Sequence, residues 1–450
     1  MQNRKVTYAL YPSPTQIIKL QGQLGLHKQL WNGALEERID AWRKAKVSIS
    51  YKDQCNSLTL IRKDPELKAE WASINCSSQQ VTLDRLNKAF TNFFSRVKQG
   101  KTPGFPRFKS DHRMNSLGFK GHKRSDGWSF KPALQNNGKP DDFGNVNWAK
   151  HGVIYLQGVG HMKVRGKARA AGVIKSCEVL CQNEQWFVSV TLECAEMDIK
   201  RERKSNQFMA ADWGMTDLLT IAETSRWLTK IPNATEDAVR FSSIDNPHFY
   251  KTSEAKSIAL SQSVSRKEKF SKRWHKAQHA RGVFEAKRAQ KRHDFQHKLS
   301  ADIASKCAQF ATEALDIKSM TSAADDLPNK KKNAFRRELL DTAPGALFKK
   351  IHYKVLETGG TYLIAPTKVI KPSQTCPPCG HQRKKPLEQR IHACTECNFT
   401  AGRDQAAALV ILYWLMGILP SITKEKRAGT APRLKSRNHL QVQTVEFAGV

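Results

Sequence analysis

The chain has 450 residues, and its 75 Lys and Arg against 41 Asp and Glu give a formal net charge of +34 at pH 7. Solubility requires far less charge, and the plainest use of so many cations is to neutralise phosphates, so we expect a nucleic acid partner, with a membrane surface or an acidic protein as alternatives. The longest apolar run, 406–419, is short for a membrane span and no signal peptide is visible, which argues against a transmembrane or secreted protein and predicts a soluble, intracellular protein.

The first hundred residues are predicted to be helical after a short opening strand at 5–10. Apolar residues recur at steps of three and four from Ile17 to Trp42, and again from Leu83 to Val97, so each run lays one stripe along a helix. The aromatic residues of these stripes are predicted to belong to a core rather than to a base-stacking platform. A chain of this length has room for two to four domains.

The next two stretches do not have a helical pattern. Residues 101–109 contain prolines and a glycine, and aromatic residues alternate with cations there, which predicts a loop that either faces nucleic acid or is an ordinary basic connector. From 152 to 193, apolar and polar residues alternate around the polar turn 182–184. This alternation is typical of an antiparallel sheet or a small barrel.

Residues 208–222 are predicted to form a strand that ends in Asp212, a turn at Gly214 and a second strand. Aspartate before a glycine turn is common, so this motif alone is weak evidence. Residues 266–298 then hold twelve Lys or Arg against three acids. Such one-sided charge predicts a helix that lies along a nucleic acid backbone rather than one that is only solvated.

Two CxxC pairs stand near the C-terminus, with a hairpin-sized insert between them, and this spacing predicts a tetrahedral Zn²⁺ site. The predicted ligands are Cys376, Cys379, Cys394 and Cys397. A disulfide pair is the alternative, but the other cysteines are scattered and nothing else indicates an oxidising compartment. A closed four-sulfur shell leaves no position for water, so the zinc is predicted to be structural, with His381 and His392 as bystanders.

An acidic residue, Asp404, stands a few residues after the second cysteine pair. It precedes the apolar segment 406–419, which is predicted to be a buried core helix. A metal knuckle that leads into an acid at the start of such a helix points to a nuclease. The basic segment after it, 424–450, lacks periodicity and is predicted to be flexible.

The order of these motifs resembles TnpB, the RNA-guided nuclease of small insertion sequences and a relative of the compact type V CRISPR effectors. The similar phrases in the second half are 212–214, 292–300, 313–320, 351–354, 373–380 and 402–407. Those in the first half are Tyr11-Pro12 with Gln16, Trp31-Asn32 and 103–109. The resemblance extends to about residue 419, and the ordered motifs are far more specific together than any one of them.

The resemblance implies an α+β multidomain fold. An oligonucleotide-binding-like wedge β-barrel would comprise 1–15 and 101–205, with a helical recognition domain, 16–100, inserted into it. An RNase H-like (RuvC) nuclease domain would comprise 206–370 and 400–420. A zinc ribbon, 371–399, would be inserted before the last acid, and 421–450 would be a flexible basic tail.

The resemblance also implies an active site. Asp212, Glu313 and Asp404 match the three acids of the family's RuvC site, which holds two catalytic Mg²⁺ ions. Three carboxylates can supply bridging and terminal oxygens and still leave positions open for water and the scissile phosphate. Glu313 is preferred to Asp316 by the register of its motif, although Ala314 stands where an acid is often seen and the preceding strand is poor in branched residues.

The implied function is RNA-guided cleavage of double-stranded DNA beside a short flanking motif, by a monomer that takes its guide RNA from the end of its own insertion sequence. A compact type V CRISPR effector is the nearest alternative. A nuclease-inactive, RNA-guided repressor and a DNA transposase with an RNase H-like fold are the others. The complete set of acids argues against the repressor, and the order of the motifs fits a transposase poorly.

Overall fold

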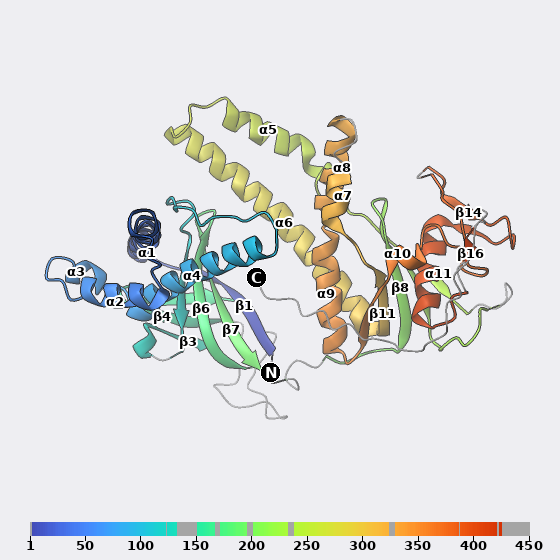
Figure 1. The fold of residues 1–450 in the computed structure, drawn as a ribbon, viewed down its shortest axis with the longest axis horizontal. Coiled ribbons are helices and arrows are strands. Elements are labelled where there is room, and N and C mark those ends of the chain that lie inside the picture. Colours follow the sequence, from blue (N-terminus) through green and yellow to red (C-terminus); the bar gives the residue numbers. More distant parts are fainter. Residues whose placement is uncertain are drawn as a thin grey trace. The chain divides into compact units, whose positions relative to one another are not determined.

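The computed structural model describes residues 2–122, 124–132, 151–166, 172–195, 201–232, 238–323, 329–386, 388–420 and 423–424. Internal contacts divide the chain into unit 1, Met1–Arg201 with Ala255–Ala289, and unit 2, Glu202–Glu254 with Gln290–Val450 (Figure 1). The predicted division into five parts is finer than these two units and remains a prediction. The predicted tail, 421–450, lies outside the described residues except for 423–424.

Unit 1 contains a seven-stranded antiparallel sheet with the order β2-β6-β7-β1-β5-β4-β3. Its strands are β1 (Gln2–Tyr11), β2 (Ser116–Lys120), β3 (Trp128–Pro132), β4 (His151–Leu156), β5 (Gly160–Arg165), β6 (Val173–Gln182) and β7 (Gln185–Cys194). Although β2 and β3 are the two edges, Nε1 of Trp128 on β3 donates to the carbonyl oxygen of Lys120 on β2 at 3.3 Å. The sheet therefore curls into a nearly closed barrel, which confirms the predicted antiparallel sheet or small barrel.

The alternating sequence pattern accounts for the barrel interior. On β5, Met162 and Val164 point into the core while their neighbours are exposed, and the core also holds the fully buried Tyr8 and Trp128. The turn between β6 and β7 is tight because Asn183 and its successor both adopt left-handed backbone angles, with φ 49° at Asn183. Two left-handed residues are what a two-residue hairpin turn of type I′ requires.

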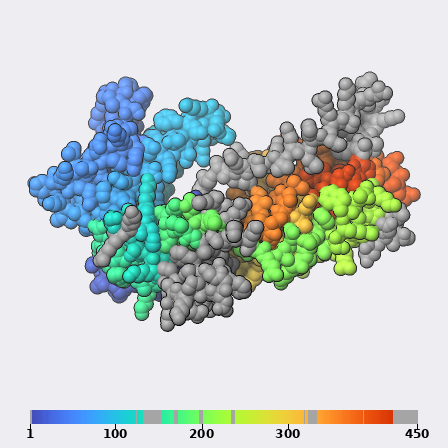
Figure 2. Space-filling model, turned by 90° about the horizontal axis from the view of Figure 1, so that it is seen from below, coloured from blue at the N-terminus to red at the C-terminus, as the bar shows by residue number. Residues whose placement is uncertain are grey.

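The helical part of unit 1 comprises α1 (Pro14–Asp40) with a π-helical end η1 (Ala41–Ala45), α2 (Tyr51–Ile61), α3 (Lys68–Trp71) and α4 (Cys76–Lys98). In Figure 2 these helices, blue to light blue, gather beside the barrel strands, teal to green. A capping box begins α1, because the Ser13 hydroxyl accepts from the Gln16 N–H and the Gln16 side chain accepts from the Ser13 N–H. The two predicted helical stripes are confirmed and form most of one core.

The aromatic residues of the two stripes divide between core and surface. Trp31 is 6% exposed and lies in the helical core, but Trp42 is 57% exposed. The prediction that these rings belong to the core is therefore wrong for Trp42. Helical spacing places it at the end of its stripe, beyond the part of the helix that neighbouring residues cover.

The predicted loop 101–109 contains no helix, as expected, and its end is attached to α1. Nε1 of Trp31 donates to the Arg107 carbonyl at 3.0 Å. The amide of Asn32 donates to the Lys109 carbonyl at 3.0 Å and accepts from the Lys109 N–H at 2.8 Å. The Lys109 ammonium lies 3.9 Å from the centre of the Trp31 ring. Two separate phrases of the resemblance thus contact each other and hold the loop to the helix.

Asn32→Ala is expected to lower the free energy of unfolding of unit 1 by about 2 kcal/mol, because two hydrogen bonds are lost and two partly buried backbone groups lose their partners. Lys109→Gln serves as a matched control, since it removes the ammonium and leaves both backbone bonds. Urea unfolding of both variants measures the difference. A loss of stability for Asn32→Ala no larger than that for Lys109→Gln would show that the two hydrogen bonds between Asn32 and Lys109 do not stabilise unit 1.

The basic stretch predicted to be helical is confirmed as a helix. After α5 (Glu254–Ser265), the single helix α6 (Lys272–Lys306) contributes its first half to unit 1 and its second half to unit 2. In the first half, the hairpin residue Asn183 donates to the Gly282 carbonyl at 3.3 Å, and a Cβ at Gly282 would lie 2.6 Å from the Asn183 side-chain oxygen. Glycine here allows the hairpin to approach the helix closely.

Unit 2 contains a five-stranded mixed sheet with the order β10-β9-β8-β11-β12. Its strands are β8 (Gln207–Trp213), β9 (Asp217–Thr224), β10 (Arg240–Asp245), β11 (Cys307–Glu313) and β12 (Thr361–Ala365). The first three form an antiparallel meander, while β11 lies parallel to β8 and β12 lies parallel to β11. The predicted strand–turn–strand at 208–222 and the predicted strand before Glu313 are both confirmed.

Helices cover both faces of this sheet. The helices are α7 (Ile317–Ala323), α8 (Asn329–Thr342), α9 (Pro344–Glu357), α10 (Thr367–Ile370) and α11 (Arg403–Leu415). Phe310 packs with residues of α9 on one face, whereas Ala210 and Ala311 pack with α11 on the other. Small side chains on β8 and β11 let α11 lie close to the sheet, which explains why the strand before Glu313 is poor in branched residues.

The apolar segment near the C-terminus forms the core of this second face. Val410, Ile411 and Leu412 of α11 are fully buried, which confirms the predicted buried helix. None of the helices in the described part of the chain is long and apolar enough to cross a membrane.

Candidate active site and metal centre

Two of the predicted acids lie at the carboxyl ends of neighbouring parallel strands. Thr312 on β11 is paired with Ala211 on β8, so the residues that follow them, Glu313 and Asp212, are neighbours at the same edge of the sheet. Parallel strands end together at such an edge, and ligands of open α/β sheets bind there. The pairing of β8 with β11 thus brings together two acids that are about a hundred residues apart in the sequence.

The third acid, Asp404, lies in the first turn of α11. The helix begins after Gly402, whose N–H donates to the Gln405 side-chain oxygen at 3.3 Å. Because α11 packs on β8 and β11, its first turn is brought to the edge where the strands end. An acid in a first turn is also favoured by the exposed backbone N–H groups of the helix start.

Electrostatics indicate that the three carboxyl groups share one neighbourhood. The pKa of Asp212 is raised well above its ordinary value, first by burial and then by the negative charges of Glu313 and Asp404, while Arg403 opposes the rise. Burial raises the pKa of Glu313 to about 7. Such a group of carboxylates is destabilised without a cation and suits divalent ions with oxygen ligands.

The grouping is looser than the cysteine cluster. Among the described residues, the cysteines are the group in which at least three metal-ligating atoms all lie within 4.8 Å of one another. The three carboxylates do not form such a group.

The structure distinguishes Glu313 from Asp316, the alternative candidate for the second acid. Asp316 immediately precedes α7, and its carboxylate accepts from the Ser319 N–H at 2.9 Å, as the N-cap of a helix does. It is not among the groups that shift the pKa of Asp212. Beside Glu313, the N–H of Ala314 donates to the Thr367 hydroxyl at 2.8 Å, and this contact fixes the end of β11.

Without Mg²⁺, the folded protein is expected to lose stability as the pH rises from about 4.5 toward 7. The unfolded state releases the Glu313 proton near its ordinary pKa of 4.5, whereas the folded state keeps it to about 7, so the folded state is stabilised at low pH and that stability is lost on the way up. The loss is about 3 kcal/mol. Urea unfolding from pH 4.5 to 8 in magnesium-free buffer measures it, and Glu313→Gln is expected to flatten the slope. An unchanged slope in that variant would contradict the burial of Glu313.

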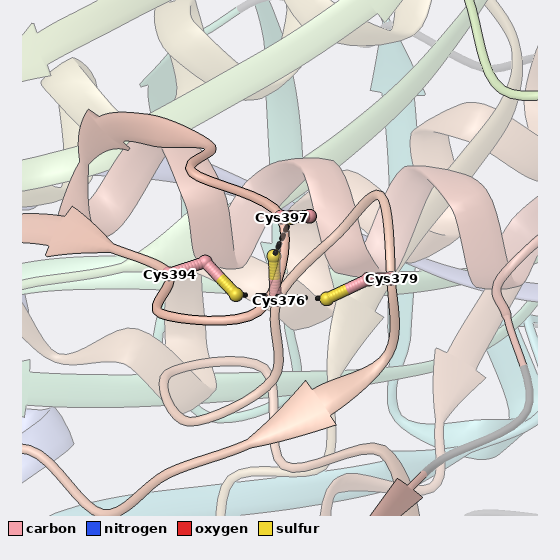
Figure 3. A group of neighbouring side chains, drawn as sticks. All are labelled: Cys376, Cys379, Cys394 and Cys397. Atoms are coloured by element: carbon pink, nitrogen blue, oxygen red, sulfur yellow. Dashed lines mark hydrogen bonds between the residues drawn. The ribbon is translucent and has the colours of Figure 1, made fainter.

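The four cysteine thiols converge on one point (Figure 3). The sulfur of Cys376 lies 3.6 Å from that of Cys397, and the sulfur of Cys379 lies 3.6 Å from that of Cys394. These separations are those of sulfurs around a common centre rather than of bonded disulfides. The donor set and its closeness therefore fit a tetrahedral zinc ion, as predicted from the spacing.

Both cysteine pairs use the same backbone turn. The N–H of Cys376 donates to the His381 carbonyl at 2.8 Å, and the N–H of Cys394 donates to the Phe399 carbonyl at 2.9 Å. Each pair is followed by a left-handed residue, Gly380 with φ 71° and Asn398 with φ 55°. Glycine and asparagine tolerate this conformation best, so each CxxC sequence encodes the turn that presents its two sulfurs.

Burial and neighbouring thiols perturb the cluster in the absence of an ion. Burial raises the pKa of Cys379 to about 11 and raises that of Cys376 further. For Cys394, burial is outweighed by backbone N–H groups that donate to the sulfur, and its pKa is lowered. His392 contacts Lys385 through its Nδ1 atom. The group of ligand atoms within 4.8 Å of one another contains the four cysteines and neither His381 nor His392.

The ribbon that carries the cysteines leads directly to the acids. It contains β13 (His381–Gln382), β14 (Ile391–Ala393) and β15 (Thr400–Gly402), and β15 passes into α11. Arg403 donates to the carbonyls of Pro386 at 2.5 Å and Gln389 at 3.3 Å. The ribbon therefore fixes the residue before Asp404, and with it the start of the helix.

A contact between two other motifs of the resemblance was not predicted. Lys354 on α9 is 1% exposed, and its ammonium donates to the His297 carbonyl at 2.5 Å and the Ser300 hydroxyl at 2.7 Å on α6. Nearby, the Gln296 amide donates to the Thr342 carbonyl at 3.0 Å. These bonds satisfy a buried cation and fix α6 against α9 on one face of the sheet. Only the proximity of the two motifs in the fold reveals this role.

The chain matches known families over three segments. Residues 188–324 match the OrfB_IS605 family, described as "Probable transposase", and 345–411 match the "Cas12f1-like, TNB domain". Residues 1–46 match the OrfB_IS605 "Helix-turn-helix domain". The resemblance to the TnpB family is confirmed. In the structure, the segment 1–46 is the strand β1 followed by α1 and its π-helical end.

Two curated proteins are similar over nearly the whole chain. One, from Escherichia coli (strain K12), is named "Putative RNA-guided DNA endonuclease InsQ"; it is 24% identical over 413 residues, which are 90% of this chain and 90% of that protein. The other, from Streptomyces pristinaespiralis, is named "Putative RNA-guided DNA endonuclease"; it is 25% identical over 410 residues, which are 91% of this chain and 88% of that protein.

Solved structures resemble the chain more distantly. The structure titled "Structure of the mini-RNA-guided endonuclease CRISPR-Cas_phi3" has a TM-score of 0.47 and 9% identity and covers 94% of both chains. The "Cryo-EM structure of the Cas12f1-sgRNA-target DNA complex" has a TM-score of 0.31 and 15% identity, with 91% of this chain and 99% of that chain covered. Similarity at this level carries no argument about activity.

Proposed function

We propose that the chain is an RNA-guided DNA endonuclease of an insertion sequence, which cuts double-stranded DNA beside a short flanking motif. The observation that carries the proposal is the gathering of Asp212, Glu313 and Asp404 at the carboxyl edge of the unit 2 sheet, where burial and mutual repulsion raise the pKa of Asp212. The names of the two curated relatives support the same activity.

In this proposal, unit 2 holds an RNase H-like (RuvC) nuclease domain. The mixed five-stranded sheet, with acids at the carboxyl ends of two adjacent parallel strands and at the start of the covering helix, is the arrangement that supports it. The three carboxylates would hold two Mg²⁺ ions. Bound Mg²⁺ would lower the pKa of a water and offset negative charge on the scissile phosphate.

Asp212 and Arg403 would set the charge of the site. The pKa of Asp212 is held up by burial and by its neighbours, so this carboxyl gains most from a cation. Arg403, bonded to two ribbon carbonyls, keeps a fixed positive charge on the same side and lowers the pKa of Asp212. Cleavage is therefore expected to be weak at low pH, where Glu313 is protonated, and to rise through pH 7.

The cysteine cluster would play a structural part. Cys376, Cys379, Cys394 and Cys397 would bind one Zn²⁺ ion. With all four positions taken by sulfur, the ion has no open site for water, and its contribution is to hold the ribbon in one conformation. Since β15 of the ribbon continues into α11, this conformation sets the position of Asp404.

Nucleic acids would be bound mainly through charge. The net charge of +34 and the basic half of α6 supply phosphate contacts for a guide RNA, and base pairing would choose the target. We infer that the nearly closed barrel of unit 1 acts as the wedge domain and that the helices α1 to α4 act with it to read the flanking motif. One copy of the chain would suffice for one guide.

The test is cleavage of a plasmid library with a fixed target and randomised flanking sequence. The protein is co-expressed with the DNA that naturally follows its gene, so that any guide RNA from that region is captured. Cuts at the guide-matched target beside one flanking motif, dependent on Mg²⁺, are expected. Tight binding of RNA and target with no cleavage would favour the nuclease-inactive repressor, and no captured RNA would overturn the proposal.

A further inference from the structure

A cavity in unit 1 is lined by none of the three acids and has no role in the site described above. Its volume is about 890 Å³, and it is bordered by α1, the segment 111–115, the hairpin between β6 and β7, and the start of α6. A cavity of this size is in the range of small-ligand sites. All of its walls belong to unit 1.

The walls combine flat rings with amide side chains. Trp274 and His275 of α6 face the cavity together with His112, whose ring centre lies 6.1 Å from that of His275. The side chains of Gln21 and Asn115 also line it. Rings offer stacking surfaces, while amides supply both a donor and an acceptor, which together match the face and the edge of a heteroaromatic ring.

The charges of the lining exclude other ligands. Among the described residues that line the cavity, none is Lys or Arg, so a phosphate group would find no cation inside. The two acids there are already paired, Asp111 with Lys28 at 2.5 Å and Glu184 with His279 at 3.4 Å. No group of three metal-ligating atoms within 4.8 Å occurs among the lining residues described. The lining therefore suits a neutral, flat ligand.

Cations stand just outside the cavity. Lys272, Arg273 and Lys276 are exposed on α6 next to the two lining rings of that helix. Just before α6, Phe270 is 76% exposed, its φ is 69°, and its ring centre lies 5.6 Å from that of Trp274. A bulky residue held in a left-handed conformation and exposed to solvent costs free energy, and such costs persist mainly at functional surfaces.

We propose that this cavity binds one unpaired nucleobase of a single-stranded nucleic acid, stacked on Trp274, with the flanking phosphates on Lys272, Arg273 and Lys276. Phe270 then offers a stacking surface to the adjacent base. The proposal rests on the proposed function in one respect only, that the chain binds nucleic acid. It assigns base contacts to a helix that charge alone would mark as a phosphate-binding surface.

The experiment compares the full chain's affinity for short single-stranded oligonucleotides that carry bases with that for matched oligonucleotides that carry abasic sites. RNA and DNA versions of each are used, at one salt concentration, by fluorescence anisotropy. Stacking of one base on one ring predicts that Trp274→Ala weakens binding of the base-bearing strands about ten-fold and leaves binding of the abasic strands unchanged. Lys276→Gln is expected to weaken both about equally, since it removes a phosphate contact.

Two further variants test whether the loss is specific to the cavity. Trp227→Ala removes another partly exposed tryptophan, in unit 2, and is expected to leave all affinities unchanged. His112→Ala alters the opposite, exposed wall of the cavity and is expected to show the same base-dependent loss as Trp274→Ala. A preference for RNA or for DNA identifies the strand that supplies the base, and either supports the proposal.

Equal losses on base-bearing and abasic strands, or no loss for either cavity variant, would overturn the inference while guided cleavage by the unchanged chain keeps the proposed function. Failure of the unchanged chain to bind any of the strands, with no captured RNA, would overturn both.

Discussion

Asp212→Asn is expected to lower the rate of guided DNA cleavage by at least about 10³-fold while guide RNA and target DNA remain bound. Asparagine has nearly the same shape but no charge, so the site loses the carboxylate whose pKa is raised most clearly by burial and by its two acidic neighbours. In magnesium-free buffer the same variant is expected to be more stable than the unchanged protein, because folding no longer has to bury this carboxylate or protonate it. Single-turnover cleavage and urea unfolding measure the two effects.

Asp316→Asn is the matched control for this prediction. It makes the same chemical change three residues after Glu313, but at a carboxylate that accepts from the Ser319 N–H. Asparagine caps helices about as well as aspartate, so cleavage and stability should stay near those of the unchanged protein. Loss of cleavage in Asp316→Asn together with full activity in Asp212→Asn would show that the acids have been wrongly assigned.

Cys376→Ser is expected to abolish zinc binding, unfold the ribbon and lower cleavage on the order of 10²-fold. The Cys376 side chain is fully buried among the other three ligands, and metal binding supplies much of the folding free energy of small zinc domains. Cleavage should fall because β15 and Arg403 no longer hold the start of α11, and with it Asp404. Metal analysis, proteolysis of the ribbon and the cleavage rate follow the three effects.

Cys55→Ser controls for the loss of a thiol. Cys55 is a half-buried free cysteine on α2 in unit 1 and has no part in the cluster. This variant should keep one zinc ion per chain and full cleavage. Purified protein without zinc, in which the four cysteines resist alkylation until a reductant is added, would show the disulfide alternative to be correct.

Local signals in the sequence predict much of this fold. Strands, helices and turns follow from short-range patterns, such as the alternation along β5 and the capping box at Ser13. The cysteine cluster is predictable because CxxC spacing and the left-handed Gly380 and Asn398 encode each turn locally. The three acids are predicted only through the ordered motifs of the resemblance, since no local pattern relates Asp212 to a residue about a hundred positions away.

Long-range packing accounts for what the sequence did not predict. Trp42 fits its helical stripe but is exposed, because the period of a stripe does not show where the covering neighbours end. The two hydrogen bonds between Asn32 and Lys109 join segments that are far apart in the chain. The burial of Lys354 also contradicts the usual behaviour of lysine, and it is explained only by its partners on α6.

We propose that an RNA held by the protein selects the DNA that it cuts. Exchanging the guide portion of the captured RNA for a new sequence tests this, with the cuts mapped on a plasmid that carries both the old and the new targets beside the same flanking motif. Cleavage is expected to move to the new target and to disappear in Asp212→Asn. Cutting that stays at the old target, or that occurs without any RNA, would contradict RNA guidance.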